Sequence, residues 1–84
     1  MSREEQRETA LRRIRHSLDR LRYQSHTAAR EDVNWGMAMG AINMANALLL
    51  IDHEEHNRLF DLNLNAALSA RVDRKAKGVS THAA

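Results

Sequence analysis

Residues 33–51 read VNWGMAMGAINMANALLLI and contain no charged residue, whereas charged residues lie on both sides of them. About 20 apolar residues cross a bilayer as a helix, so length alone would permit a membrane span. However, Asn34, Asn43 and Asn46 would be costly in hydrocarbon, and the acidic flanks lack the Lys and Arg that anchor a span. The stretch therefore predicts a helix that is buried in protein and not in a membrane.

The apolar side chains of this helix fall on two opposite faces when they are placed at about 100° per residue. One face holds Val33, Met37, Met44, Leu48 and Ile51, and the other holds Trp35, Met39, Ile42 and Leu49. A helix with two apolar faces has to be covered from two directions. Gly36 and Gly40 each cost about 1 kcal/mol relative to alanine. Either a second helix approaches closely at this pair or both glycines are merely tolerated.

Helices are predicted on both sides of the central one. Before it, a helix is predicted to begin after Ser2, which caps it. Its apolar side chains recur at the 3-4-3 spacing of a coiled-coil seam, at Leu11, Ile14, Leu18 and Leu21. After it, Asp52 caps a helix with a wide apolar arc. Residues 24–29 contain no Gly or Pro, which leaves two alternatives at the first junction. We favour a turn capped by Ser25 or Thr27 over one continuous helix with a shifted stripe.

These patterns predict an all-α fold: a three-helix domain of residues 1–76 with a buried central helix. The helices are expected at about 3–24, 29–51 and 53–75, followed by a flexible tail at 77–84. Because the first helix offers only a narrow apolar stripe, the helices of one chain cannot cover all the apolar surface of the other two. We therefore expect a homodimer that forms a larger helical bundle. The predicted core and dimer interface comprises Leu11, Ile14, Leu18, Leu21, Trp35, Met39, Ile42, Leu49, Phe60 and Leu64.

Composition sets further bounds. The 84 residues include no cysteine, which excludes a disulfide framework and thiol chemistry. The charged N-terminus is followed by no apolar run, so no signal peptide is predicted and a cytoplasmic location is expected. The net charge is +4 over residues 1–30, −5 over 31–70 and +3 over 71–84. This distribution suits internal or head-to-tail pairing as well as an anionic partner.

Side chains that could carry catalysis or bind metal are few. The serines lack a base and a glycine elbow, and no Gly-rich phosphate loop is present, so we predict neither an enzyme nor a cofactor. His53 and His56 are three positions apart among acidic residues, whereas the histidines of the zinc motif His-Glu-x-x-His are four apart. We favour a helix cap over a metal site. Asn63 lies on an apolar arc and is expected either to pair with Asn43 or Asn46 or to be partly exposed.

Two functional classes fit this sequence. The first is a non-catalytic protein-interaction module, an adaptor or inhibitor that acts as a homodimer on an unidentified protein partner. The alternative is a small nucleic-acid-binding regulator that contacts phosphates, or an acidic partner, through its first helix. The candidate contact residues are Arg12, Arg13, Arg15, Arg20 and Arg22. Acidic residues are interspersed among them, so intrahelical pairs such as Glu8 with Arg12 and Asp19 with Arg22 are also predicted.

Overall fold

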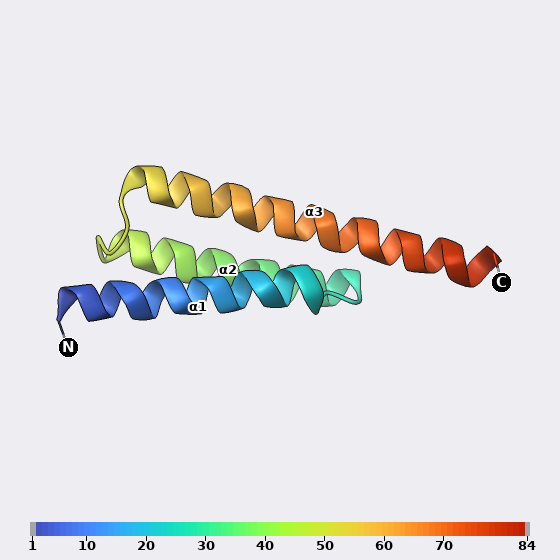
Figure 1. Cartoon of the computed structure of the whole chain (residues 1–84), viewed down its shortest axis with the longest axis horizontal. Helices are drawn as coiled ribbons and strands as arrows, with labels where there is room; N and C mark the ends of the chain where they lie inside the picture. The colour runs from blue at the N-terminus through green and yellow to red at the C-terminus, as the bar shows by residue number, and fades with distance from the viewer. Residues whose placement is uncertain (1, 84) are drawn as a thin grey trace.

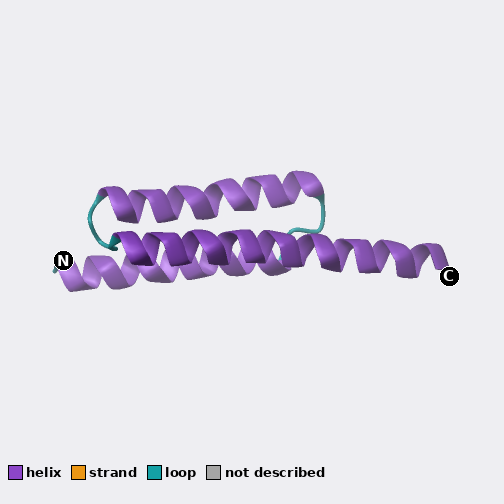
Figure 2. Cartoon of the chain, turned by 90° about the horizontal axis from the view of Figure 1, so that it is seen from above, coloured by secondary structure: helices purple, strands orange, loops and turns teal. Residues whose placement is uncertain are grey.

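The structure is a computed structural model that describes residues 2–83, with side chains described for residues 2–77. It contains three helices, α1 (Arg3–Tyr23), α2 (Ala28–Ala47) and α3 (His53–Ala83). Successive helices run in opposite directions, every pair of helices is in contact, and α3 projects beyond the other two at its C-terminal end (Figures 1 and 2). No strand occurs within residues 2–83. The predicted all-α, three-helix fold and the break between the first two helices are confirmed.

Side-chain caps begin each helix where the sequence predicted them. The amide of Glu5 donates to Ser2 Oγ at 3.1 Å, and the amide of Arg30 donates to Thr27 Oγ1 at 3.0 Å. At α3, the amide of Glu55 donates to Asp52 Oδ1 while the amide of Asp52 donates to Glu55 Oε1. This reciprocal pair satisfies two amides that a helix start otherwise leaves without partners.

The end of α2 differs from the prediction, because the helix stops at Ala47 and not at residue 51. Leu49 has a φ of 58°, in the left-handed region. The amide of Leu49 donates to the carbonyl of Asn46, and that of Leu50 donates to the carbonyl of Ala45. These two bonds form a Schellman motif, which usually has glycine at the left-handed position. The sequence pattern missed the turn because a leucine occupies that position.

Replacing Leu49 with glycine is expected to raise the free energy of unfolding by about 0.5–1 kcal/mol, because glycine adopts positive φ without the Cβ penalty. The Leu49 side chain is 76% exposed, so little packing is lost. Leu49→Ala is the matched control, since it removes the side chain but keeps the strain. Urea unfolding of both variants checks this expectation; equal stability of the two variants would contradict it.

The end of α3 also differs from the prediction. The helix continues to Ala83, whereas the sequence pattern placed its end near Lys75. Gly78 therefore lies within the helix and does not end it. The predicted flexibility of residues 77–84 stays a prediction.

The core corrects the prediction of a fully buried α2. Its buried apolar side chains are Ala38, Ile42 and Ala45, which lie on a single arc of the helix. The main cluster contains Ile14, Ile42, Ala45, Leu50 and Ile51, with Ala10, Leu11, Leu18, Ala41 and Leu59 packed against it. Most of the face predicted around Val33 is left exposed. Small alanines on the buried arc let α1 and α3 both approach α2, and two neighbouring helices cover only part of its circumference.

Two asparagines are buried in the bundle. Asn34 donates from Nδ2 to Ser25 Oγ at 3.2 Å and so joins α2 to the preceding turn. Asn63 is fully buried, and both of its amide atoms lack a hydrogen-bond partner among the described residues. The predicted pairing of Asn63 with Asn43 or Asn46 is wrong, as is its predicted exposure. Asn43 instead contacts His56, with 3.2 Å between Oδ1 and Nε2.

Candidate interaction surfaces

An exposed apolar stripe runs along α2. We define the α2 stripe as Val33, Met37, Gly40, Met44 and Leu48. The four large side chains are between 50% and 61% exposed. The five residues of the stripe follow one another at intervals of 4, 3, 4 and 4 positions, which keeps them on one face of a helix over a length of about 22 Å. Contiguous exposed apolar side chains make this face a candidate interaction site.

The glycines of α2 face open space. A Cβ built on Gly36 or Gly40 would meet no heavy atom within 4 Å apart from the local helix backbone. The close approach that these glycines permit is therefore not used within the described chain. Another helix could pack directly against the backbone at Gly40, in the middle of the α2 stripe.

A groove between α1 and α2 continues the α2 stripe toward α1. Its volume is about 340 Å³. It is lined by Gln6, Thr9, Ala10, Arg13, Ala41, Met44, Ala45, Leu48 and Leu50. Met44 and Leu48 belong to both the groove and the stripe, so an apolar side chain that packs on this half of the stripe can enter the groove. Arg13 places a positive charge on its rim.

A second exposed apolar row lies on α3. We define the α3 ridge as Phe60, Leu64, Leu68 and Val72, which follow one another at four-residue intervals. All four are exposed. Phe60 also contacts Trp35 of α2, with ring centroids 6.2 Å apart and planes inclined at 77°. This edge-to-face pair fastens α3 to α2, so only the outer side of the ridge remains for another molecule.

The residues predicted for the core and dimer interface are divided between core and surface. Ile14, Leu21 and Ile42 are buried within the chain's own bundle, and Leu11, Leu18, Trp35 and Met39 are half-buried. Leu49, Phe60 and Leu64 are exposed. That set contained no residue of the exposed α2 stripe, although the periodicity had grouped the large side chains of the stripe on one face. Whether any predicted residue contacts a second copy stays a prediction.

The predicted arginine contacts are not equivalent. Arg12, Arg13 and Arg15 are exposed, and none forms an ion pair with another described residue. Arg20 is half-buried, and Arg22 pairs with Asp73 of α3. The intrahelical pairs predicted for the first helix are therefore wrong. The guanidinium of Arg22 reaches Asp73, so this pair joins α1 to α3.

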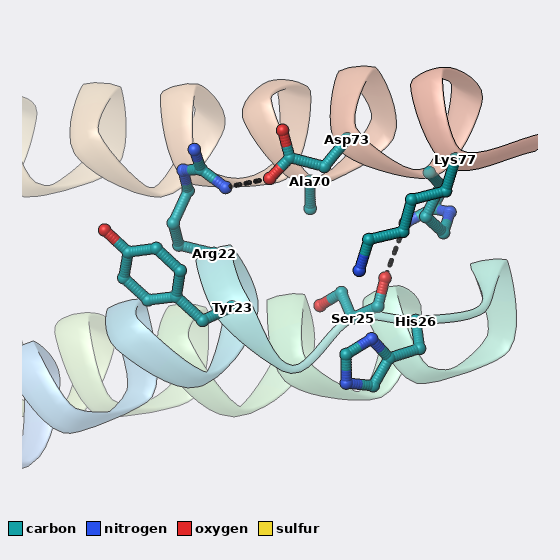
Figure 3. Close-up of a pocket in the computed structure, with 8 residues that line it drawn as sticks. Arg22, Tyr23, Ser25, His26, Ala70, Asp73 and Lys77 are labelled. Carbon is teal, nitrogen blue, oxygen red and sulfur yellow. Dashed lines mark hydrogen bonds and ion pairs between the residues drawn. The ribbon is translucent and has the colours of Figure 1, made fainter. Parts of the chain in front are cut away.

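A pocket of about 280 Å³ lies where the turn between α1 and α2 meets α3. Figure 3 shows Arg22 and Asp73 facing each other across this pocket, and Lys77 extending toward the turn. Arg74 donates to the carbonyl of Ser25 at 3.0 Å. The polar groups of the pocket thus hold the turn against α3, which gives the pocket a structural role.

A buried carboxylate on α2 pairs with two arginines of α3, one of them exposed. The Glu31 side chain is only 5% exposed, and its two oxygens lie 2.9 Å from Arg71 Nη2 and Arg74 Nη2. The hydrogen bond from Arg71, aided by Arg74, lowers the pKa of Glu31 although burial opposes the shift. The charge segregation of the sequence signalled internal pairing but did not identify these partners, because Glu31 and Arg71 are 40 positions apart.

A second ion pair joins α1 to α3. Arg7 Nη1 donates to Glu55 Oε1 at 2.9 Å and to the carbonyl of Leu50 at the same distance. The hydrogen bond from Arg7 lowers the pKa of Glu55, and the same bond raises the pKa of Arg7. Arg3 donates to the carbonyls of Leu48 and Leu49. Two arginines of α1 therefore hold the turn between α2 and α3.

The two histidines at the start of α3 contact amides. His53 Nε2 lies 3.4 Å from Asn57 Nδ2, and His56 contacts Asn43. Within the part of the chain that the structure describes, no three His, Cys, Asp or Glu side chains are grouped so that they could hold a metal ion.

None of the three helices, as far as the structure describes them, is long and apolar enough to cross a membrane. Comparisons with protein-family models, curated proteins and solved structures gave no match to this chain.

Proposed function

We propose that this chain is a non-catalytic protein-interaction module that pairs with a second copy through the α2 stripe. The observation that supports this proposal is the stripe itself, with large apolar side chains at least half exposed around an open glycine. Burying apolar surface contributes about 25 cal/mol per Å², and an isologous interface buries each side chain twice, once in each copy. As an adaptor or inhibitor in the cytoplasm, the dimer would present the α3 ridge of each copy to a protein partner.

Light scattering coupled to size-exclusion chromatography tests the pairing. The expected mass is twice the 9.6 kDa of the chain. Met44→Glu is expected to return the protein to a monomer, because a carboxylate at the centre of an apolar interface would be buried without a partner. Leu62→Glu is the matched control, since Leu62 is exposed on α3 outside the α3 ridge. It should leave the mass doubled.

The helical circular dichroism of both variants shows whether they remain folded. The measurement is made at about 100 µM, which is on the order of the Kd of a weak interface. A wild-type chain that is monomeric at this concentration would overturn the proposal. So would a Met44→Glu variant that stays dimeric.

Nucleic-acid binding through α1 is the second candidate. The exposed guanidinium groups of Arg12, Arg13 and Arg15 support it, because no described side chain forms an ion pair with them. Phosphate contacts through such groups weaken steeply as salt rises. Gel shifts with duplex DNA at several salt concentrations separate this candidate from the first, and no shift at low salt would remove it.

A further inference from the structure

We propose that the two copies cross antiparallel, about a two-fold axis that passes between Gly40 and Ala41 of α2. This inference rests on the proposed function, because it specifies how the second copy sits on the α2 stripe. Two observations favour the antiparallel arrangement: the order of side chains along the stripe and the position of Arg30 at its start. The open backbone at the centre of the stripe permits close approach in either direction.

The order of side chains along the stripe reads the same in both directions. Met37 lies three positions before Gly40, and Met44 lies three positions after Ala41. Val33 lies seven positions before Gly40, and Leu48 lies seven positions after Ala41. An antiparallel two-fold pairing therefore places methionine against methionine, valine against leucine, and glycine against alanine. Isologous interfaces require this kind of self-complementarity.

The smallest side chains lie at the proposed axis. No heavy atom lies within 4 Å of the Cβ position of Gly40, and Ala41 is half-exposed beside it. Two helices that cross at small residues approach more closely than the usual 8–10 Å between axes, roughly by the length of a side chain. The larger side chains on both sides then pack around the crossing point. A parallel pairing would also meet at Gly40, but it would set Val33 against Val33 and Leu48 against Leu48.

An exposed arginine lies at the start of the stripe. Arg30 lies three positions before Val33, is exposed, and has no ion pair among the described residues. α2 ends at Ala47, so the negative end of its dipole lies at the far end of the stripe. The antiparallel arrangement brings Arg30 of each copy toward this end of the partner's α2, whereas a parallel one brings the two Arg30 side chains together. Antiparallel helix dipoles also attract each other.

The groove between α1 and α2 accommodates the same arrangement. Met44 and Leu48 line the groove. Because the partner's Met37 and the partner's Val33 would lie against these two residues, their side chains would be directed at its opening. The two-fold axis repeats this contact, so that both grooves are filled.

Disulfide cross-linking tests the direction of pairing, since the chain contains no native cysteine. Val33→Cys and Leu48→Cys are made as separate variants, one with a mass tag, then mixed and mildly oxidised. In the antiparallel dimer the mixture gives a covalent heterodimer on a non-reducing gel, whereas neither variant alone gives a covalent homodimer. In Ala41→Cys, whose cysteine is close to the axis, the two cysteines at position 41 of the two copies link to each other. Leu62→Cys, exposed on α3, is the control and should not link.

The outcomes separate this inference from the proposed function. Linking of Val33→Cys to itself would show a parallel dimer, and would overturn the antiparallel axis while leaving the α2 stripe as the interface. A dimeric mass without linking at residues 33, 41 or 48 would place the interface elsewhere and overturn both proposals. A monomeric wild-type chain would also overturn both. Each cysteine variant is weighed by light scattering before oxidation. If Val33→Cys and Leu48→Cys dissociate, a mixture of Met37→Cys and Met44→Cys tests the direction in the same way, while Ala41→Cys tests only whether α2 is the interface.

Discussion

Replacing Glu31 with glutamine is expected to lower the free energy of unfolding at pH 7 by about 2 kcal/mol, since Arg71 and Arg74 lose the carboxylate charge with which they pair. The side chain is almost completely buried between α2 and α3, so water cannot replace these contacts. Urea unfolding measures the difference. Glu8→Gln, which neutralises an exposed carboxylate on α1, is the control and should change stability by less than about 0.5 kcal/mol.

The contribution of Glu31 should also depend on pH. Arg71 and Arg74 hold the pKa of Glu31 below its ordinary value of 4.5 in the folded chain. A carboxylate with a depressed folded pKa stabilises the fold fully above its unfolded pKa, and this stabilisation is lost as pH falls through the folded pKa. The stability difference between wild type and Glu31→Gln should therefore be constant above about pH 5 and shrink below it. A difference that is unchanged down to pH 2 would contradict the role assigned to the ion pair.

Replacing Asn63 with leucine is expected to raise the free energy of unfolding by about 1–3 kcal/mol, because two buried amide atoms without protein partners are replaced by apolar groups of similar volume. Asn65→Leu, on the exposed side of the same helix, is the matched control and should change stability by less than about 0.5 kcal/mol. Thermal and urea unfolding measure both variants. A loss of stability in Asn63→Leu would contradict this expectation.

The sequence predicted the helices and their starts well because these depend on local chemistry. Ser2, Thr27 and Asp52 each accept from the amide three positions later, and any chain with these residues at a helix start can form such bonds. The end of α2 depends instead on the strained backbone of Leu49, which residue type does not reveal. Helix ends without a glycine or proline signal are difficult to read for this reason.

The buried face of α2 was only partly predictable. Periodicity grouped Val33 with Met37 and Ile42 with Trp35, but it could not show which group faces α1 and α3. The choice depends on alanines 38 and 45, whose small size lets two helices pack closely. The pairing of Glu31 with Arg71 needed the register between α2 and α3, which follows only from the folded chain.

Arg3 and Arg7 contact the turn between α2 and α3 through backbone carbonyls of residues 48–50 and through Glu55. Carbonyl oxygens are the same whatever side chain the residue carries. Residues 48 and 49 could therefore vary during evolution without loss of these bonds, and the path of the turn would be inherited even as its side chains change. The side chain at one end of the α2 stripe can thus change while the scaffold beneath it stays fixed.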